Sequence, residues 1–586
     1  MHTNTYHKTK YILDLILVGI GLISLICFIF VSGFYLTNEW YRFFLITSKI
    51  TLGIFVLQEL IRWFIVPDKR VYARSRIAES LIVILVISEE IFPSSVLSWL
   101  AIILPEMSIN EYSLLLISLT QLAVLISILI KALRYNRYIN KIQLNSGSLL
   151  TISFILVIAI GTFFLLLPRS VSYGEQPLSF TNALFTSVSA VCVTGLVVVD
   201  TATQFSIFGK LIIGTLIQVG GLGLMTLTSF IAIMVSGNLS VRAKVLMKDI
   251  LSQENINEGI NLLFKILAFT FFIEIIGAIL LYLSISNWSL INFNKGVFFD
   301  CLFHSISAFC NAGFSVYSEG LMKQNIQSNY TFISVIMVLI VLGGLGFFTL
   351  NDVFRNFWKK QNRRKIKISS KIIIITTLIL IISGMIVFSV FESTLFSYTN
   401  LIDQFFHSLF LSVTSRTAGF NALPMDVISN AGIMFLIILM WIGASPGSTG
   451  GGVKTSTVAV AIITLFNYIR GKERIEVFKR EISPENSKQA LMVITSSLLF
   501  LGFGTTMLVW IEPNIEPLHL IFEATSAIST VGLSIGITPN LTDYSKYILI
   551  ILMFVGRIGV FTFFLSLYKP KPEPRFRLPS EKIMIG

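Results

Sequence analysis

Four glycines, each in a short segment rich in serine, threonine and alanine, are the residues whose type and spacing best suit a chemical task. Gly195, Gly313, Gly419 and Gly532 lie 118, 106 and 113 residues apart. A short amphipathic stretch precedes each glycine, and a long apolar run follows it. Glycine lets a backbone turn successive carbonyl groups to one side, and inward-facing carbonyl oxygens can replace the water around a small cation. The pattern therefore predicts a site that binds monovalent cations through backbone oxygens.

A second set of four glycines follows the first at similar distances along the chain. Gly220, Gly343, Gly443 and Gly556 follow the loop glycines by 25, 30, 24 and 24 residues. Close packing of membrane helices explains any one of these glycines, but it does not explain matched spacing to a Ser/Thr-Gly loop in every case. We infer four copies of a helix, re-entrant loop, helix unit: copy 1 over residues 147–250, copy 2 over 251–365, copy 3 over 366–480 and copy 4 over 481–570.

The loops must be placed by the helices around them. Non-helical backbone at membrane depth persists only where it is buried in protein or lines water, so four such loops point to one shared aqueous axis. The short stretch before each loop is expected to support it. Hydroxyl groups in these stretches are expected to bond the freed backbone, as at Ser189, Ser307, Ser412 and Ser526.

Composition places the chain in a membrane. Hydrophobic residues make up 54% of the 586 positions and charged residues 13%, and the mean hydropathy is +0.81. Apolar runs long enough to span a bilayer recur from Tyr11 to Leu567, roughly twelve in all. The first run lacks a cleavage site and is expected to be retained. The four cysteines and five histidines show no CxxC or HExxH spacing, which argues against a zinc or disulfide framework.

The formal charge of +13 is concentrated in a few short connections. Residues 354–371 carry eight lysines and arginines, whereas the connections around 170–181, 392–400 and 511–517 are almost free of them. This alternation is the positive-inside pattern. It predicts a multi-pass protein of the inner (plasma) membrane with a cytoplasmic C-terminus, and such scattered basic loops do not favour nucleic-acid binding.

The loop motifs resemble those of the Trk/Ktr/HKT superfamily of potassium transporters, from about Gly147 to the C-terminus. The similar segments are VTGL ending at Leu196, NAGFS ending at Ser315, RTAGFN ending at Asn421 and TVGLS ending at Ser534. The resemblance implies an all-α integral membrane protein with four repeats around one pseudo-fourfold pore. It also implies a K⁺ selectivity filter made by the carbonyls of Val193, Thr194, Gly195, Asn311, Ala312, Gly313, Thr417, Ala418, Gly419, Thr530, Val531 and Gly532. In plant members a serine at the first filter glycine accompanies sodium selectivity, so four glycines favour potassium.

A run of small residues interrupts the apolar stretch of copy 3 and resembles the family's intramembrane gate loop. Its members are Gly443, Ser445, Gly447, Ser448, Thr449, Gly450, Gly451, Gly452 and Lys454. A nucleotide P-loop is the rival interpretation, because Gly447–Thr455 almost matches its motif. Val453 separates Gly452 from Lys454, however, and no soluble strand precedes the run.

Arg557 stands where the other copies have Gly221, Gly344 and Ala444. An arginine near the middle of a spanning helix costs about 2.5 to 3.5 kcal/mol on insertion scales. We therefore expect it to face the conduction path, as the resemblance also implies. A helix-end arginine reaching toward the membrane surface is the alternative, which its position well inside the apolar run disfavours.

Residues 1–146 precede the repeats and are expected to form an accessory membrane domain. The predicted spans are Ile12–Phe34, Phe43–Phe64, Ala78–Ile103 and Leu114–Leu133. Lys131, Arg134 and Arg137 recur every third residue, which faintly resembles a voltage sensor. We favour a scaffold that does not sense voltage, since these residues lie where a cytoplasmic linker is ordinarily basic.

The favoured function is a potassium uptake channel or transporter subunit, with no enzyme activity and no cofactor in this chain. A Na⁺- or H⁺-coupled cation symporter stays open as an alternative. The membrane subunit of an ATP-driven pump is a further alternative, but it would require a phosphorylated Asp motif or a P-loop in a large cytoplasmic domain, and no predicted cytoplasmic loop exceeds about 25 residues. A receptor or structural membrane protein leaves the four loops unexplained. Family resemblance implies a homodimer docked on a cytosolic ring of nucleotide-binding RCK subunits.

Overall fold

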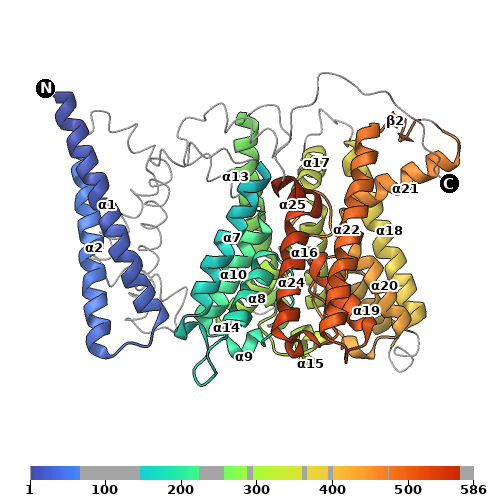
Figure 1. The fold of residues 1–586 in the computed structure, drawn as a ribbon, viewed down its shortest axis with the longest axis horizontal. Helices are drawn as coiled ribbons and strands as arrows, with labels where there is room; N and C mark the ends of the chain where they lie inside the picture. Colours follow the sequence, from blue (N-terminus) through green and yellow to red (C-terminus); the bar gives the residue numbers. More distant parts are fainter. Residues whose placement is uncertain are drawn as a thin grey trace.

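The computed structural model describes residues 2–65, 83, 146–223, 256–286, 295–358, 366–392, 400–472 and 474–567. The described regular structure is almost wholly helical, as the sequence predicts, and its strands are the two-residue pair β1 (Glu476–Val477) and β2 (Arg480–Glu481). The pair is antiparallel. Figure 1 shows the helices standing side by side, with the chain running from α1 at one edge to the copies beyond it.

Each copy begins with a long helix, continues into a short one and then into a third. The first helices are α7 (Ser146–Leu165), α13 (Ile256–Ile285), α18 (Ile368–Phe391) and α22 (Pro484–Ile511). The short helices are α8 (Phe180–Val191), α14 (Lys295–Phe309), α19 (Leu401–Thr414) and α23 (Pro517–Ile528). The second long helices are α10 (Ile207–Gly221), α16 (Tyr330–Leu345), α20 (Asn430–Trp441) and α24 (Asp543–Ile558). The helices thus follow the order that the sequence predicts for each copy.

The sequence predicts an interruption of the second long helix in copy 3, and the structure shows such breaks in copies 2 and 4 as well. The chain bends by 100° between α16 and α17 (Phe347–Trp358). Breaks also separate α20 from α21 (Thr455–Ile469) and α24 from α25 (Val560–Leu567). Gly346 and Gly559 lie at two of the breaks with φ of +83° and +89°, which glycine adopts without strain.

Four described helices are long and apolar enough to cross a membrane, and a fifth is added if α16 and α17 count as one span. They comprise α2 (Asn38–Ile65), α18, α22 and the Lys265–Ile285 part of α13. Several of the other predicted spans form shorter apolar helices, since the breaks divide them. The remaining short elements are α9 (Thr201–Gln204), α15 (Gln324–Gln327), η2 (Pro168–Ser170), η3 (Gly320–Met322), η4 (Met425–Val427) and η5 (Thr538–Asn540).

The N-terminal part contributes α1 (His2–Gly33) and α2, which pack together as a helical hairpin (Figure 1). These helices lie at the first two predicted spans. Arg169 of η2 donates to the carbonyl of Val31 at 2.8 Å and ties this hairpin to copy 1. The third and fourth predicted spans, and the triplet of Lys131, Arg134 and Arg137, lie outside the described residues.

In copies 1, 2 and 3, a serine of the short helix bonds the first helix of the same copy. A glycine on the first helix makes room for it: a Cβ at Gly161, Gly277 or Gly384 would meet the serine oxygen at 2.5, 2.4 or 2.2 Å. The bonds are from Ser187 to the carbonyl of Ile158 at 2.9 Å, from Ser305 to that of Glu274 at 2.7 Å and from Ser412 to that of Ile381 at 2.8 Å.

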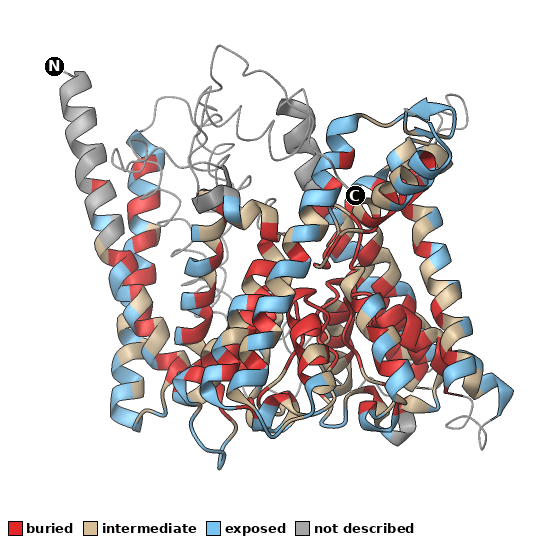
Figure 2. Cartoon of the chain, turned by 45° about the vertical axis from the view of Figure 1, so that its right-hand side comes forward, coloured by how far each residue is buried: buried red, intermediate tan, exposed pale blue. Residues whose placement is uncertain are grey.

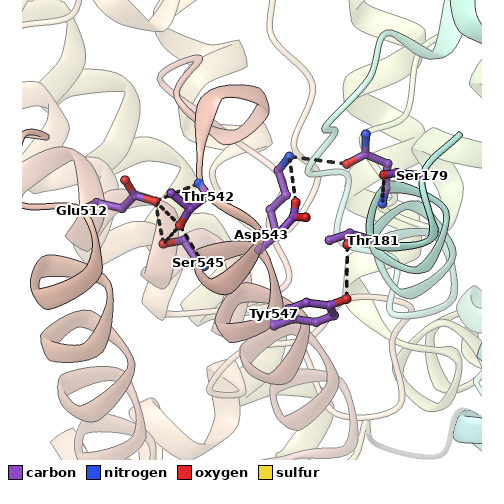
Figure 3. Close-up of polar contacts among 9 residues, drawn as sticks. Ser179, Thr181, Glu512, Thr542, Asp543, Ser545 and Tyr547 are labelled. Carbon is purple, nitrogen blue, oxygen red and sulfur yellow. Dashed lines mark hydrogen bonds and ion pairs between the residues drawn. The ribbon is translucent and has the colours of Figure 1, made fainter. Parts of the chain in front are cut away.

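The copies close into a ring. The second long helix of each copy packs on the short helix of the next: α10 on α14, α16 on α19, α20 on α23 and α24 on α8. Figure 3 shows the last of these seams, where Tyr547 of α24 lies 3.2 Å from the hydroxyl of Thr181 on α8. Lys546 also reaches Asn182 at 3.4 Å. Because copy 4 meets copy 1, all four short helices surround one axis.

A carboxylate caps the second long helix in copies 3 and 4. Glu512, at the end of α22, accepts from the backbone N–H and hydroxyl of Thr542 at 2.8 and 2.7 Å and from the hydroxyl of Ser545 at 2.8 Å (Figure 3). Glu392 accepts from Ser429 at 2.6 Å in the same way. These contacts satisfy donors that the start of a helix leaves free.

Candidate functional site

The site is built from four buried tripeptides, which we name glycine loops 1 to 4: Val193–Gly195, Asn311–Gly313, Thr417–Gly419 and Thr530–Gly532. Their eight non-glycine residues are fully buried, and Figure 2 shows the buried residues concentrated in the middle of the bundle. Each loop follows directly on the end of a short helix, so the helix fixes where the loop begins.

The four loops share one backbone conformation. The first residue of each loop has φ of +56°, +59°, +66° or +50°, and the glycine has φ of +94°, +68°, +75° or +93°. The middle residue does not share the positive φ. Alternation of left- and right-handed residues turns neighbouring peptide groups to a common side. A positive φ at a non-glycine residue is strained, so its recurrence at Val193, Asn311, Thr417 and Thr530 indicates that the surrounding structure imposes it.

The glycines touch the next loop in the ring. A Cβ at Gly195 would lie 2.4 Å from the carbonyl oxygen of Ala312 in loop 2. The same distance is 2.8 Å from Gly313 to Ala418, 2.2 Å from Gly419 to Val531 and 2.1 Å from Gly532 to Thr194. The loops therefore encircle a single axis in the order 1, 2, 3, 4 and back to 1. No larger residue fits at any of the four glycines without displacing a carbonyl group.

The carbonyl oxygens of the loops are free of hydrogen bonds. None of the twelve accepts a bond from another described residue. The amide groups, by contrast, are used: those of Thr194, Ala312 and Val531 donate to serine carbonyls of their short helices at 2.8, 2.7 and 2.8 Å. Buried carbonyl groups are ordinarily hydrogen-bonded, so a ring of unpaired carbonyl groups indicates a site where a ligand can bind to the oxygens.

Side-chain hydroxyls hold the outer ends of the loops. Ser189 donates to the carbonyl of Leu196 at 2.7 Å, and Ser307 donates to that of Phe314 at 2.8 Å. Ser526 accepts from the amide of Gly532 at 3.0 Å. These three serines meet the expectation that hydroxyls bond the freed backbone.

Copy 3 departs from that pattern, and the expectation for Ser412 is wrong. Thr414 takes the role by donating to the carbonyl of Phe420 at 2.8 Å, while Ser412 bonds the first helix instead. The reason is one residue fewer in this copy. Thr414 lies five positions before Gly419, whereas Ser189, Ser307 and Ser526 lie six positions before the glycines of their loops.

The gate-loop segment, Gly443–Lys454, fills the break between α20 and α21. It is closed on itself by bonds from the amide of Gly443 to the carbonyl of Val453 at 2.9 Å and from Ala444 to Gly451 at 3.3 Å. Bonds to copy 2 anchor it, from Ser445 to the carbonyl of Gly344 at 3.0 Å and from the Thr449 hydroxyl to Phe309 at 3.1 Å. The segment is therefore a defined structure held against the neighbouring copy.

The same segment lies directly against two glycine loops. A Cβ at Gly450 would meet the hydroxyl of Thr417 at 2.1 Å, and one at Gly451 would meet that of Thr530 at 2.2 Å. Both hydroxyls are buried and lack a hydrogen-bond partner among the described residues. The glycines of this segment thus allow it to approach loops 3 and 4 more closely than any other residue type could.

Two cations lie beside this segment. Arg557 donates to the carbonyls of Thr449 and Gly220, bridging copy 3 and copy 1. Lys454 donates to the carbonyl of Gly450 at 2.7 Å. No ion pair of either side chain with a described carboxylate is present. The expectation that Arg557 lies near the middle of a helix is wrong, since α24 ends at Ile558 and the chain turns at Gly559.

Sequence reasoning overlooked two buried side chains behind the glycine loops, His304 and Glu523. A histidine or glutamate nine positions before the loop glycine, within a short helix, is the signal that could have found them. Among the described residues, no group of three or more His, Cys, Asp or Glu side chains is placed to hold a metal ion, and the four cysteines are buried and free.

This chain is similar to known proteins in both sequence and fold. The family model described as TrkH, cation transport protein, matches residues 118–577. Ktr system potassium uptake protein B of Bacillus subtilis is 36% identical over 460 residues, covering 78% of this chain and 100% of that protein. Potassium/sodium uptake protein NtpJ of Enterococcus hirae is 34% identical over 455 residues, covering 76% and 98%. The crystal structure of the potassium transporter TrkH from Vibrio parahaemolyticus matches with a TM-score of 0.57 at 16% identity, covering 89% of this chain and 98% of that one.

The matched family region contains all four glycine loops, the gate-loop segment and Arg557. Its description as a cation transport protein confirms the expectation of an ion transporter in a membrane, in place of an enzyme. The structural match confirms the all-α membrane fold class. The chain belongs to the TrkH family of cation transport proteins.

Proposed function

We propose that this protein is a potassium uptake channel or transporter subunit in which the four glycine loops form the selectivity filter. The observation that carries the proposal is the ring of twelve carbonyl oxygens, eight of them on fully buried residues, without a hydrogen-bond donor among the described residues. Such oxygens can replace the hydration shell of a monovalent cation, and they carry no full charge that would trap it. The relatives named for potassium uptake support the same ion.

Potassium is favoured over sodium because glycine occupies the same position in all four loops. Each glycine lies against a carbonyl of its neighbour, so the spacing of the oxygens depends on the whole ring. One relative is named for both potassium and sodium uptake, which makes the selectivity ratio the quantity to measure.

The gate-loop segment is proposed to open and close the path below the filter. It touches loops 3 and 4 through Gly450 and Gly451, and its carbonyls hold Lys454 and Arg557. Two positive groups beside a cation path repel the ion. Motion of this segment would therefore change both the width of the path and the charge that faces it.

The setting of the protein follows from charge and family. We propose an inner (plasma) membrane protein with a cytoplasmic C-terminus, since the basic connections lie on one side by the positive-inside pattern. A homodimer and a cytosolic nucleotide-binding ring subunit are proposed by family analogy. Residues 1–146 are proposed to be an accessory domain outside the four repeats of 147–586, and it is not expected to sense voltage.

Uptake of radioactive rubidium into proteoliposomes that contain the purified protein tests the function. An outward potassium gradient alone should drive uptake, and external potassium should compete with rubidium far better than sodium does. Uptake that appears only with a sodium or proton gradient would establish the coupled symporter instead. Absence of rubidium uptake under all gradients would refute the proposed function.

A further inference from the structure

Two buried polar side chains connect the short helices to the far ends of glycine loops 2 and 4. His304 on α14 lies nine residues before Gly313, and Glu523 on α23 lies nine residues before Gly532. Neither side chain is exposed. Each bonds a serine two residues after the glycine: His304 Nε2 lies 2.9 Å from the hydroxyl of Ser315, and Glu523 accepts from the hydroxyl of Ser534.

The carboxylate of Glu523 makes the more extensive connection. Besides Ser534, it accepts from the backbone amide of Ile535 at 3.2 Å and from the hydroxyl of Thr538 at 2.9 Å. A buried carboxylate is costly unless donors surround it, and here all three donors belong to the segment that leaves the loop. The side chain and that segment therefore fix each other's position.

The ring of His304 is oriented by its other nitrogen. Nδ1 lies 2.7 Å from the carbonyl of Asp300 one turn earlier. A carbonyl only accepts, so Nδ1 carries the hydrogen and, in the neutral ring, Nε2 accepts from Ser315. The ring also stacks on Tyr317 with centroids 4.6 Å apart, which holds it against the end of loop 2.

Loops 1 and 3 lack this connection. The residue nine positions before Gly195 is Thr186, which bonds its own helix at the carbonyl of Asn182, and Val197 stands where the serine would be. In copy 3, where one residue fewer precedes the glycine, the corresponding position is the apolar Leu411. Since the loops follow one another around the axis in the order 1 to 4, the two connected loops lie opposite each other.

We propose that His304 and Glu523 are positioning residues that hold loops 2 and 4 at the spacing that discriminates potassium from sodium, with Glu523 the stronger of the two. This inference rests on the proposed function of the glycine loops as the filter. In loop 4 the short helix therefore holds the chain at two points: Ser526 accepts from the amide of Gly532, and Glu523 accepts from Ser534, two residues later. Without the connection, the outer part of the loop relaxes and its carbonyl oxygens can close around the smaller ion.

The test compares variants of Glu523 with a matched carboxylate that does not touch the loops. Glu523→Ala removes every acceptor, whereas Glu523→Gln keeps one oxygen for Ser534 and Ile535 and offers an amide to the oxygen of Thr538. Glu512 is the control, because it also accepts from three donors in copy 4 but caps α24 instead. The measurement is the bi-ionic reversal potential in planar bilayers, which gives the potassium-to-sodium permeability ratio, together with Tm of the same preparations.

We expect Glu523→Ala to lower the ratio about five- to tenfold, which corresponds to about 1 to 1.4 kcal/mol of lost discrimination. Glu523→Gln should retain most of the wild-type ratio, and Glu512→Ala should lower Tm without changing the ratio. A wild-type ratio in folded Glu523→Ala overturns the inference, as does an equal loss in Glu512→Ala.

If Glu523→Ala does not fold, Ser534→Ala removes one donor and leaves those of Ile535 and Thr538 in place. An unchanged ratio in Ser534→Ala then overturns the inference. A wild-type protein that does not prefer potassium would instead refute the proposed function itself, so the two failures are distinguishable.

Discussion

Replacing Gly195 by serine is the most direct perturbation of the proposed filter. The residue has φ of +94°, and an added Cβ would lie 2.4 Å from the carbonyl oxygen of Ala312, against 3.4 Å or more for an ordinary contact. That oxygen must therefore move by about 1 Å, since the clash is with backbone rather than with a flexible side chain. The displaced carbonyl belongs to loop 2, so its movement changes the distance between opposing oxygens of the ring.

The expected magnitude has two parts. The backbone strain of a non-glycine residue at this φ costs about 1 to 3 kcal/mol, which lowers stability. Loss of the favoured oxygen spacing is expected to reduce the free-energy difference between potassium and sodium in the filter by about 1 to 2 kcal/mol, roughly a 5- to 30-fold fall in permeability ratio. The strain affects folding, whereas the displaced carbonyl affects selectivity.

A matched control separates the two parts. Gly174 has φ of +93°, and nothing lies within 4 Å of a Cβ placed there. Gly174→Ser therefore carries similar backbone strain without touching a carbonyl of the ring. Bi-ionic reversal potentials should show a reduced ratio for Gly195→Ser and the wild-type ratio for Gly174→Ser. A folded Gly195→Ser protein with the wild-type ratio would refute the reasoning, and a loss in both variants would assign the effect to strain.

Three further predictions concern the gate-loop segment and the helix caps. Arg557→Ala should raise potassium flux at low ionic strength and flatten its salt dependence, because screening no longer modulates a charge beside the path; unchanged flux in folded protein would contradict this. Deleting Ser448–Gly452 should raise basal flux in proteoliposomes, and an unaltered flux would reduce the segment to a packing element. Burial raises the pKa of Glu512, but hydrogen bonds from Thr542 and Ser545 outweigh it and lower the pKa below the ordinary value of 4.5. The stabilisation from the ionised Glu512 cap is thus complete above pH 4.5 and is lost as pH falls through the lower folded-state pKa. Thermal unfolding of Glu512→Gln should therefore show a lower Tm than wild type at neutral pH, and its Tm should fall less than that of wild type on acidification.

Glycine explains why so much of the arrangement is predictable from sequence. At Gly195 and its counterparts, glycine is required both because φ is positive and because a neighbouring carbonyl lies close to the Cα atom. Other residue types adopt a positive φ only with strain, and their Cβ would clash with the carbonyl, so glycine is required at each position. The second set behaves similarly: a Cβ at Gly220, Gly343 or Gly556 would lie within 2.1 Å of a carbonyl at the end of a short helix. The assignment of the loops to a filter stays a prediction that the flux experiments test.

The features that sequence reasoning missed depend on single-residue register. One residue fewer before Gly419 moves the supporting hydroxyl from Ser412 to Thr414, and nothing in the local composition distinguishes these two hydroxyls. The helix breaks at Gly346 and Gly559 are similar, because a glycine in an apolar run is equally consistent with a packing contact. Only the tertiary contacts decide between a turn and a straight helix at such positions.

The one copy that carries the gate-loop segment is also the one whose second glycine has a different contact. In the other three copies this glycine lies against the end of the short helix, whereas a Cβ at Gly443 would meet the carbonyl of Gly451, 2.2 Å away in its own segment. Beside this glycine, the segment thus takes the place that the end of the short helix has in the other copies. Because its neighbours on either side are loops 3 and 4, a change in this single copy is sufficient to act on the whole ring. Fourfold symmetry is therefore needed for the carbonyl ring but not for the element beneath it.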